Sequence, residues 1–198
     1  LFLSRIVEVL ESNDPLARAI TLRVLGTVAP YIPARLDMQH TIFACVRSSS
    51  QQEVDAAIEA LSQVCAASPS FAKGILPKLT DLIAHLETPP AHKLALIRLF
   101  RHMGNDVATV RAARRACCDL IELFPDASTT LCLLESQCEL AQKSCVFLDA
   151  HLSLLLRYAG GTQPLVQLFC LRQLCKLVRK DVLSQVTVQP QAILEILP

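Results

Sequence analysis

The sequence predicts an all-α protein, an α-α superhelix (solenoid) of about five helix pairs stacked in a right-handed superhelix. Apolar residues recur with a helical period along the chain, and the strict alternation typical of β-strands is absent. Turn residues interrupt this pattern, and the second helix of each pair is predicted to start near Pro15, Gln51, Pro90, Ser128 and Gln163. These starts are 35 to 39 residues apart, a spacing typical of two-helix repeats.

Composition supports a single repeat region over residues 1–198. Hydrophobic residues make up 52% of the chain, which fits helices that contact neighbours on both sides. The net charge of +1 provides no overall attraction to nucleic acid or to anionic lipid. The longest apolar run, residues 146–159, contains Asp149, His151 and Arg157, so we expect a buried helix and no membrane contact. The chain begins with Leu1 and shows no signal peptide, and we expect it to be a fragment of a longer protein.

The first of these helices has clear start signals. Asn13 or Asp14 can cap it, because a short side-chain oxygen accepts a backbone N–H that lacks a partner in the first turn. Pro15 suits the first helical position, where a missing N–H costs nothing. Apolar residues then follow on nearly all sides, so we expect the helix to be buried. These residues are Leu16, Ala17, Ile20, Val24 and Leu25.

Arg18 follows in the same helix and has two interpretations. It can contact a partner protein together with Asp14. We favour a structural role, in which Arg18 satisfies backbone carbonyls and an acidic residue of the neighbouring repeat, such as Asp55.

Two further features concern how the helices pack. The small residues Ala56, Ala57 and Ala60 allow helices to approach closely. Pro77 lies within an otherwise helical run, so it either kinks that helix or marks its true start.

The pattern Asp14-Pro15-x-x-Arg18, followed by Leu25-Gly26, resembles the second helix of HEAT and armadillo repeats. The run from Ser12 to Gly26, with the Tyr31-Ile32-Pro33-x-Arg35 segment after it, resembles the N-terminal repeats of the Integrator complex subunit 7 family. Other segments resemble that family in the same order: Glu53-Val54-x-Ala56-Ala57, Phe71-Ala72-x-Gly74-Ile75, Lys93-Leu94-x-Leu96-Ile97, His102-Met103 and Leu154-Leu155-Leu156-x-Tyr158. The resemblance is most specific in the first third of the chain and thin after Ala127. Gly160-Gly161-Thr162-Gln163-Pro164 stands where the family has a charged turn.

This resemblance implies a noncatalytic scaffold subunit of the nuclear Integrator complex. That complex binds RNA polymerase II, cleaves nascent RNA, forms the 3′ ends of small nuclear RNAs and attenuates other transcripts. The family is also linked to DNA-damage checkpoint signalling. The implied partners are the neighbouring protein subunits of the complex.

No pattern in the sequence indicates an enzyme, a cofactor, a metal site or a small-molecule substrate. The nine cysteines include no C-x-x-C pair, and Cys132, Cys138 and Cys145 lack zinc-ligand spacing. We expect buried free thiols in a reducing compartment. The five histidines are scattered, although His85 and His92 flank a Pro-Pro turn and could approach each other. Nucleophile and phosphate-binding motifs are absent.

Basic residues form two groups that can contact a partner or nucleic acid. The first group consists of Arg98 and Arg101 before a short turn and Arg111, Arg114 and Arg115 after it, the last three on one helix face. The second group consists of Arg172, Lys176, Arg179 and Lys180. The favoured interpretation of both is a solvated face, or charge matching against Asp106, Asp119, Glu122 and Asp181. The alternative is weak contact with RNA or DNA, although few aromatic residues accompany these groups to stack on bases.

Three function classes therefore remain after sequence analysis. A protein–protein scaffold is favoured by the repeats and by the lack of catalytic motifs. A repeat protein that contacts nucleic acid through its basic groups is the second class. The third is a generic HEAT-repeat adaptor for trafficking or transport, which only the resemblance of residues 12–26 to the Integrator family disfavours.

Overall fold

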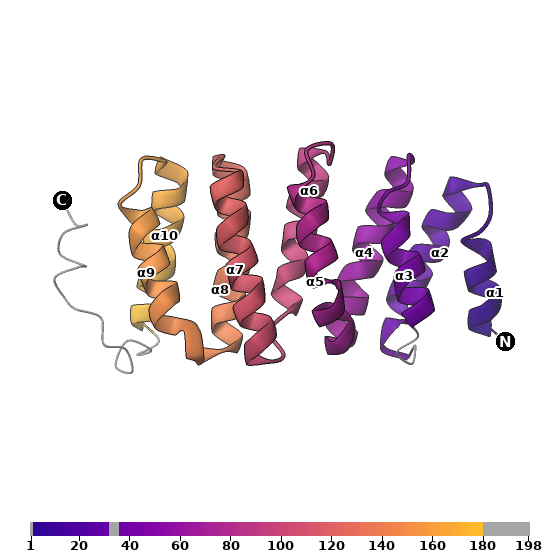
Figure 1. The fold of residues 1–198 in the computed structure, drawn as a ribbon, viewed down its shortest axis with the longest axis horizontal. Helices are drawn as coiled ribbons and strands as arrows, with labels where there is room; N and C mark the ends of the chain where they lie inside the picture. The colour runs from indigo at the N-terminus through magenta and orange to yellow at the C-terminus, as the bar shows by residue number, and fades with distance from the viewer. Residues whose placement is uncertain (1, 32–35, 180–198) are drawn as a thin grey trace. The chain divides into compact units, whose positions relative to one another are not determined.

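A computed structural model describes residues 2–31 and 36–179 of the chain (Figure 1). Within these ranges the chain is helical with no β-strand, which confirms the predicted all-α repeat fold. The α-helices are α1 (Phe2–Val9), α2 (Pro15–Thr27), α3 (Leu36–Cys45), α4 (Gln51–Ala67), α5 (Pro69–Ala84), α6 (Pro90–Ile97), α7 (Val107–Leu123), α8 (Ala127–Lys143), α9 (Leu148–Ala159) and α10 (Pro164–Arg179). Three short 3₁₀ turns, η1 (Ala29–Tyr31), η2 (Arg98–His102) and η3 (Cys145–Phe147), connect or extend them.

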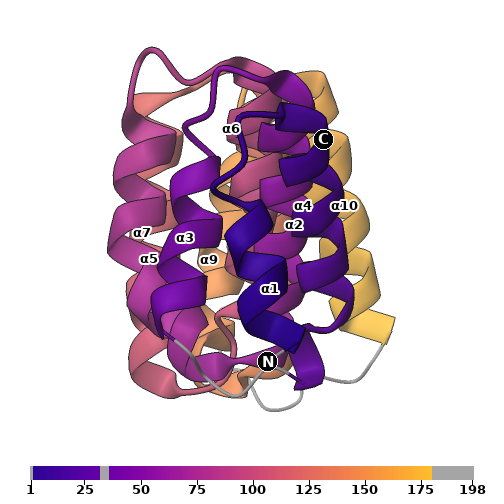
Figure 2. The same ribbon diagram turned by 90° about the vertical axis from the view of Figure 1, so that its right-hand side faces the viewer.

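The chain divides into two compact units. Unit 1 spans residues 1–103 and contains the helix pairs α1/α2, α3/α4 and α5/α6. Within it α2 packs most extensively against α4, and Figure 2 shows α3 and α5 in one layer with α2 and α4 in the other. Unit 2 spans residues 104–198 and contains the pairs α7/α8 and α9/α10, with α8 also packed against α10.

The starts of the second helices are where the repeat spacing predicts them. Helices α2, α4 and α6 begin at Pro15, Gln51 and Pro90, as predicted. Helices α8 and α10 begin at Ala127 and Pro164, each one residue away from the predicted position. The expectation of about five helix pairs is therefore confirmed for the part of the chain that the structure describes.

Side-chain caps explain why several helices begin where they do. Asp14, Ser68, Asp106 and Asp126 each accept a backbone N–H from the first turn of the helix that follows. Proline occupies the first position of α2, α5 and α6. Pro77 lies inside α5, which begins at Pro69, so the alternative in which Pro77 marks the start of that helix is wrong.

Each unit has its own apolar core. In unit 1 the fully buried side chains include Leu22, Leu61, Leu79, Ile83, Leu96 and Phe100. In unit 2 they include Cys117, Leu133, Leu134, Leu140 and Leu155. Helices α2 and α4 approach so closely that a Cβ at Gly26 would lie 3.1 Å from the Cα of Ala60. The small residues of α4 thus permit the close packing that the sequence predicted.

The expectation that the apolar residues of α2 are all buried is wrong. Leu25 is fully buried, but Leu16, Ile20 and Val24 are 53%, 52% and 39% exposed. These three residues are four apart and form one stripe along the helix. The contacts of α2 with α1 and α4 bury its other side, around Ala19 and Leu25, and leave this stripe exposed.

Candidate functional site

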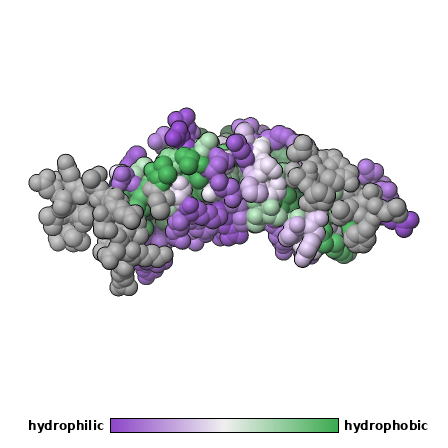
Figure 3. All heavy atoms as spheres, turned by 90° about the horizontal axis from the view of Figure 1, so that it is seen from below, coloured by the Kyte–Doolittle hydropathy of each residue, from purple (hydrophilic) through white to green (hydrophobic). Residues whose placement is uncertain are grey.

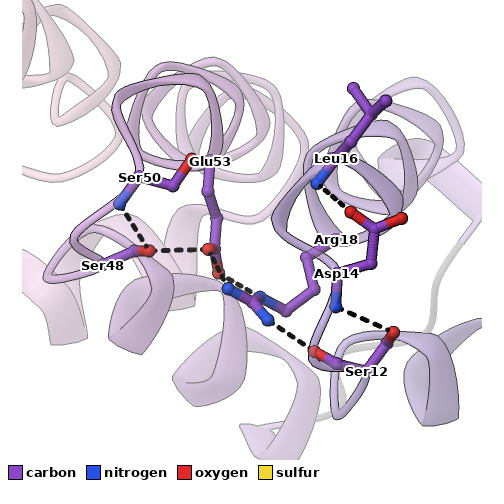
Figure 4. A network of polar contacts seen from close by, with 7 residues as sticks. All are labelled: Ser12, Asp14, Leu16, Arg18, Ser48, Ser50 and Glu53. Atoms are coloured by element: carbon purple, nitrogen blue, oxygen red, sulfur yellow. Dashed lines mark hydrogen bonds and ion pairs between the residues drawn. The ribbon is translucent and has the colours of Figure 1, made fainter.

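The predicted repeat turn is a network of hydrogen bonds at the start of α2 (Figure 4). Asp14 is the N-cap of α2, and its Oδ1 accepts a hydrogen bond from the backbone N–H of Leu16 at 2.9 Å. The backbone N–H of Asp14 in turn donates to Ser12 Oγ at 3.2 Å. Of the two candidates that the sequence offered, Asp14 and not Asn13 is therefore the residue that caps the helix. This arrangement fixes the chain where it enters α2.

Arg18 connects this turn to the second helix pair. Its Nε and Nη2 donate to the two carboxylate oxygens of Glu53 at 2.8 and 2.6 Å, and its Nη1 donates to the backbone carbonyl of Ser12. Ser48 Oγ donates to Glu53 Oε2 at 2.6 Å, so Glu53 accepts from both sides (Figure 4). The hydrogen bond from Arg18 lowers the pKa of Glu53, although burial opposes this effect. The carboxylate is therefore ionised and locked between α2 and α4.

The acidic partner of Arg18 is Glu53, and the expectation that it is Asp55 is wrong. Glu53 is only 3% exposed and faces α2 from the first turn of α4. Asp55 lies two residues further on, about 200° around the helix, and therefore points away from α2. Its carboxylate instead accepts a hydrogen bond from Gln51 at 2.9 Å and lies 3.6 Å from His92 Nε2.

A pocket of about 570 Å³ with both polar and apolar lining residues lies in unit 1, beside the ends of α3 and α5 and the starts of α4 and α6. His85 and His92 both line it, together with Arg47, Asp81 and Glu87. The two histidines that flank the Pro-Pro turn thus share one pocket. Among the described residues, however, no group of three or more His, Cys, Asp or Glu side chains is placed to hold a metal ion.

Most cysteines of the described segments are core thiols. Cys65, Cys117, Cys132, Cys138 and Cys170 are buried and free. Cys45 and Cys118 are partly buried, and Cys175 is exposed on α10, so the expectation of a buried thiol is wrong for Cys175. Burial raises the pKa of Cys65 and of Cys138 to about 12 and that of Cys170 to about 11. These thiols are protonated at neutral pH, which is the opposite of what an activated nucleophile requires.

The basic residues of the first group divide between the two units. In unit 1, Arg98 is exposed, and Arg101 is partly buried with its Nε 3.2 Å from Nε2 of His102. In unit 2, Arg111 and Arg115 are exposed on α7, whereas Arg114 is buried. A solvated face is therefore correct for Arg111 and Arg115 and wrong for Arg114.

In the second basic group, Arg172 and Lys176 are exposed on α10. The side chain of Arg179 and all of Lys180 lie outside the described residues.

Arg114 lies among groups that carry no negative charge. Its guanidinium carbon is 5.7 Å from the centroid of the Phe147 ring, and that of Arg111 is 5.8 Å from the same ring. Burial lowers the pKa of Arg114. Nearby His151 is 1% exposed, and burial lowers its pKa to about 4 with a further contribution from the charge of Arg114.

Sequence reasoning missed Glu53, Phe147 and His151. A signal for Glu53 exists, because Ser50-Gln51-Gln52-Glu53 has the S-x-x-E pattern of a helix start. The Ser50 side chain makes no cap hydrogen bond, however, and Glu53 turns to Arg18 instead. Phe147 and His151 carry no signal in the sequence, because only the packing of α9 and η3 brings them to Arg114.

Stacked helix pairs, joined across helices by polar networks such as that of Arg18 and Glu53, define a helical-repeat protein. No described helix is both long and apolar enough to cross a membrane. Comparison with known proteins then shows the family. Residues 1–195 match the sequence model of the N-terminal region of Integrator complex subunit 7, and the chain belongs to that family.

Individual relatives agree with the family match. The chain is 34% identical over 176 residues to an Integrator complex subunit 7 homolog from Dictyostelium discoideum, covering 88% of this chain and 17% of that protein. It is 38% identical over 157 residues to Integrator complex subunit 7 from Danio rerio and from Homo sapiens, covering 79% of this chain and 16% of each relative. The chain thus spans less than one fifth of the length of these relatives.

A solved structure shows the same fold. The crystal structure of an engineered protein superposes with a TM-score of 0.56 at 14% identity, covering 97% of this chain and 92% of that one. At this identity the likeness concerns the fold alone.

Proposed function

We propose that this chain is the helical-repeat region of a noncatalytic scaffold subunit of the Integrator complex. The observation that carries the proposal is the family match over residues 1–195. The fold supports it, because stacked helix pairs offer long surfaces for protein partners. Its partners would be other protein subunits of the complex, and its location would be the nucleus.

The proposed process is the one in which that complex acts with RNA polymerase II. It comprises 3′-end processing of small nuclear RNAs and attenuation of other transcripts, with a further connection to the DNA-damage checkpoint. In this role the chain positions other subunits and performs no cleavage itself. The buried, protonated thiols and the structural use of Arg18 and Glu53 support a noncatalytic role.

Affinity purification of the full-length protein from nuclear extract, followed by quantitative mass spectrometry, tests the proposal. We expect Integrator subunits in near-equal amounts to the bait. Recovery of coat or transport proteins with no Integrator subunit would instead support a generic HEAT-repeat adaptor.

A second candidate function is weak contact with RNA or DNA in unit 2. It is favoured by the exposure of Arg115, Arg172 and Lys176, whose side chains are free to meet phosphates. Binding of a fluorescent RNA should weaken steeply as salt is raised and should be lost in the double variant Arg115→Glu/Arg172→Glu. Binding that changes neither with salt nor with these substitutions would exclude this second function.

A further inference from the structure

Arg114 of α7 is a buried cation without a counter-charge. The residue is 8% exposed, and its Nη1 is buried without a hydrogen-bond partner. None of the described carboxylates forms an ion pair with it. Burying a guanidinium costs hydration free energy, which is offset only when an anion or a hydrogen-bond acceptor contacts the group. This arrangement is therefore unfavourable in the isolated chain. A water molecule could satisfy the N–H but would not neutralise the charge.

The aromatic ring beside Arg114 compensates only in part. Phe147 of η3 attracts both Arg114 and Arg111, whose guanidinium carbons lie 5.7 and 5.8 Å from its centroid. Two like charges at one ring also repel each other, and that repulsion is stronger where water is excluded. The pair of arginines therefore creates a local excess of positive charge at the junction of α7, η3 and α9.

His151 adds an unused polar group to this site. It lies one helical turn after Phe147, and its Nδ1 is buried without a hydrogen-bond partner. The imidazole is neutral at neutral pH, because burial and the charge of Arg114 oppose its protonation. A neutral imidazole carries one N–H donor, which can assist in holding an anion.

We propose that Arg114, with Arg111, Phe147 and His151, forms a recognition site for the carboxylate of an Asp or Glu side chain on a protein partner. The proposal rests on the scaffold role proposed above and specifies the chemistry of one contact. A carboxylate supplies the missing charge, and its two oxygens match the planar donors of a guanidinium. The apolar wall of Phe147 keeps water away, which strengthens the ion pair once it forms.

The depth of the site favours a protein side chain over nucleic acid. A phosphate backbone is bound by rows of exposed cations, whereas Arg114 is a single cation that is only 8% exposed. Val146, next to Phe147, is 68% exposed and gives a partner an apolar contact at the rim. In the view of Figure 3, groups of hydrophobic side chains lie among hydrophilic ones on the surface.

Thermal unfolding of the purified chain tests whether the site binds a carboxylate. Sodium acetate, exchanged for chloride at constant ionic strength, should raise Tm in the native chain and in the Arg115→Met control. It should not raise Tm in Arg114→Met, which lacks the buried cation. In chloride, Arg114→Met should unfold at the same or a higher temperature than the native chain, because it removes an unpaired charge. Equal acetate shifts in all three proteins, or a large loss of Tm in Arg114→Met, would overturn the proposal.

Direct binding of two negatively charged polymers distinguishes a protein partner from a nucleic-acid partner. We expect a fluorescent poly-glutamate peptide to bind the native chain and to bind Arg114→Met at least tenfold more weakly, with Arg115→Met near the native value. Poly-uridylate RNA binding should be equal in native and Arg114→Met proteins. RNA binding that depends on Arg114, or equal losses of peptide binding in both variants, would contradict a carboxylate site.

Purification of full-length Arg114→Met and Arg115→Met variants from cells then tests the carboxylate site separately from the proposed scaffold function. Selective loss of one or a few subunits in Arg114→Met alone supports the acidic contact within the complex. Absence of Integrator subunits even from the native protein would refute the proposed function while leaving the acetate and peptide results valid. Full recovery of every subunit with Arg114→Met would show that Arg114 makes no such contact within the complex, and would contradict the proposal.

Discussion

Buried polar residues in this protein are of two kinds, those whose charge is compensated by hydrogen bonds and those that lack a partner. Glu53 accepts three hydrogen bonds, two from Arg18 and one from Ser48, so its charge is compensated. Arg114 and His151 are also buried, at 8% and 1% exposure, but each has a nitrogen without a partner. The first arrangement stabilises the isolated fold, and the second leaves groups that a ligand can satisfy.

Glu53→Leu is predicted to lower Tm by several degrees, because it leaves the Arg18 guanidinium without its carboxylate. The double variant Arg18→Leu/Glu53→Leu should lose less than the sum of the two single losses, since neither partner then remains alone. The pKa of Glu53 is lowered in the fold, so this stabilisation is present at neutral pH and is lost as pH falls below the ordinary value of 4.5. Differential scanning calorimetry measures each Tm.

The pair Arg23 and Glu59 is a matched control for that experiment. It also joins α2 to α4, but its atoms are 3.7 Å apart and both side chains are 56% exposed. Arg23→Leu with Glu59→Leu should change stability by less than about 1 kcal/mol. If this exposed pair matters as much as the buried one, burial is not the cause of the Glu53 effect.

His151 should make the protein less stable as the pH falls from 7 to 5. Its pKa is about 4 in the fold and 6.5 ordinarily, so in this range the unfolded chain binds a proton that the folded chain does not. The difference amounts to about 2 kcal/mol at pH 5. Urea unfolding of His151→Gln should show a flatter dependence on pH, whereas the exposed His85→Gln should keep the native slope. Identical slopes in all three proteins would rule out His151 as the titrating group.

At the scale of the helices, the packing of α2 against α4 depends on the small size of Gly26. Gly26 in α2 faces the backbone of Ala60 in α4, and Gln63 lies at 3.2 Å from the position of a Cβ. Gly74 in α5, in contrast, has open space around it. The two glycines are both helical, so they differ in packing and not in backbone conformation.

Gly26→Val should destabilise the protein by about 1–3 kcal/mol, because the added methyl groups force α2 away from α4. Gly74→Ala should stabilise it by about 0.5–1 kcal/mol, since alanine favours a helix and meets no atom there. Chemical denaturation measures both changes. A neutral Gly26→Val would show that the two helices can separate without cost.

On the scale of the whole chain, exposed apolar stripes favour self-association. Leu16, Ile20 and Val24 form such a stripe in unit 1, and α10 presents Leu165, Leu168 and Leu171 in unit 2. Exposed apolar surface that no neighbour covers associates in water.

The isolated chain is therefore predicted to self-associate in light scattering, with an apparent mass that rises with concentration. Ile20→Glu places a charge within the stripe of α2 and should shift the chain toward the monomer, whereas Ala66→Glu, at an exposed site on α4, should not. A native chain that stays monomeric at high concentration would contradict this expectation.

The sequence by itself determined the fold class and the positions of the helices. Repeat spacing and turn residues predicted starts at Pro15, Gln51 and Pro90, because capping and proline chemistry act within one turn of a helix. The same local logic predicted a cap at Asn13 or Asp14, and the structure shows that it is Asp14. It also predicted buried thiols, since cysteines among apolar residues at helical spacing face a core, and this is correct for five cysteines but wrong for the exposed Cys175.

Only the tertiary structure decided which side of each helix is covered and which residues meet across helices. Periodicity shows that α2 is apolar, but the positions of α1 and α4 determine that Leu16 is exposed while Leu25 is buried. Glu53 replaces Asp55 as the partner of Arg18 for the same reason, because the two acids point to different sides of α4. Arg114 belongs to a basic cluster in the sequence, yet the packing of η3 and α9 removes it from water. Burial depends on contacts between residues distant in sequence, which local patterns do not encode.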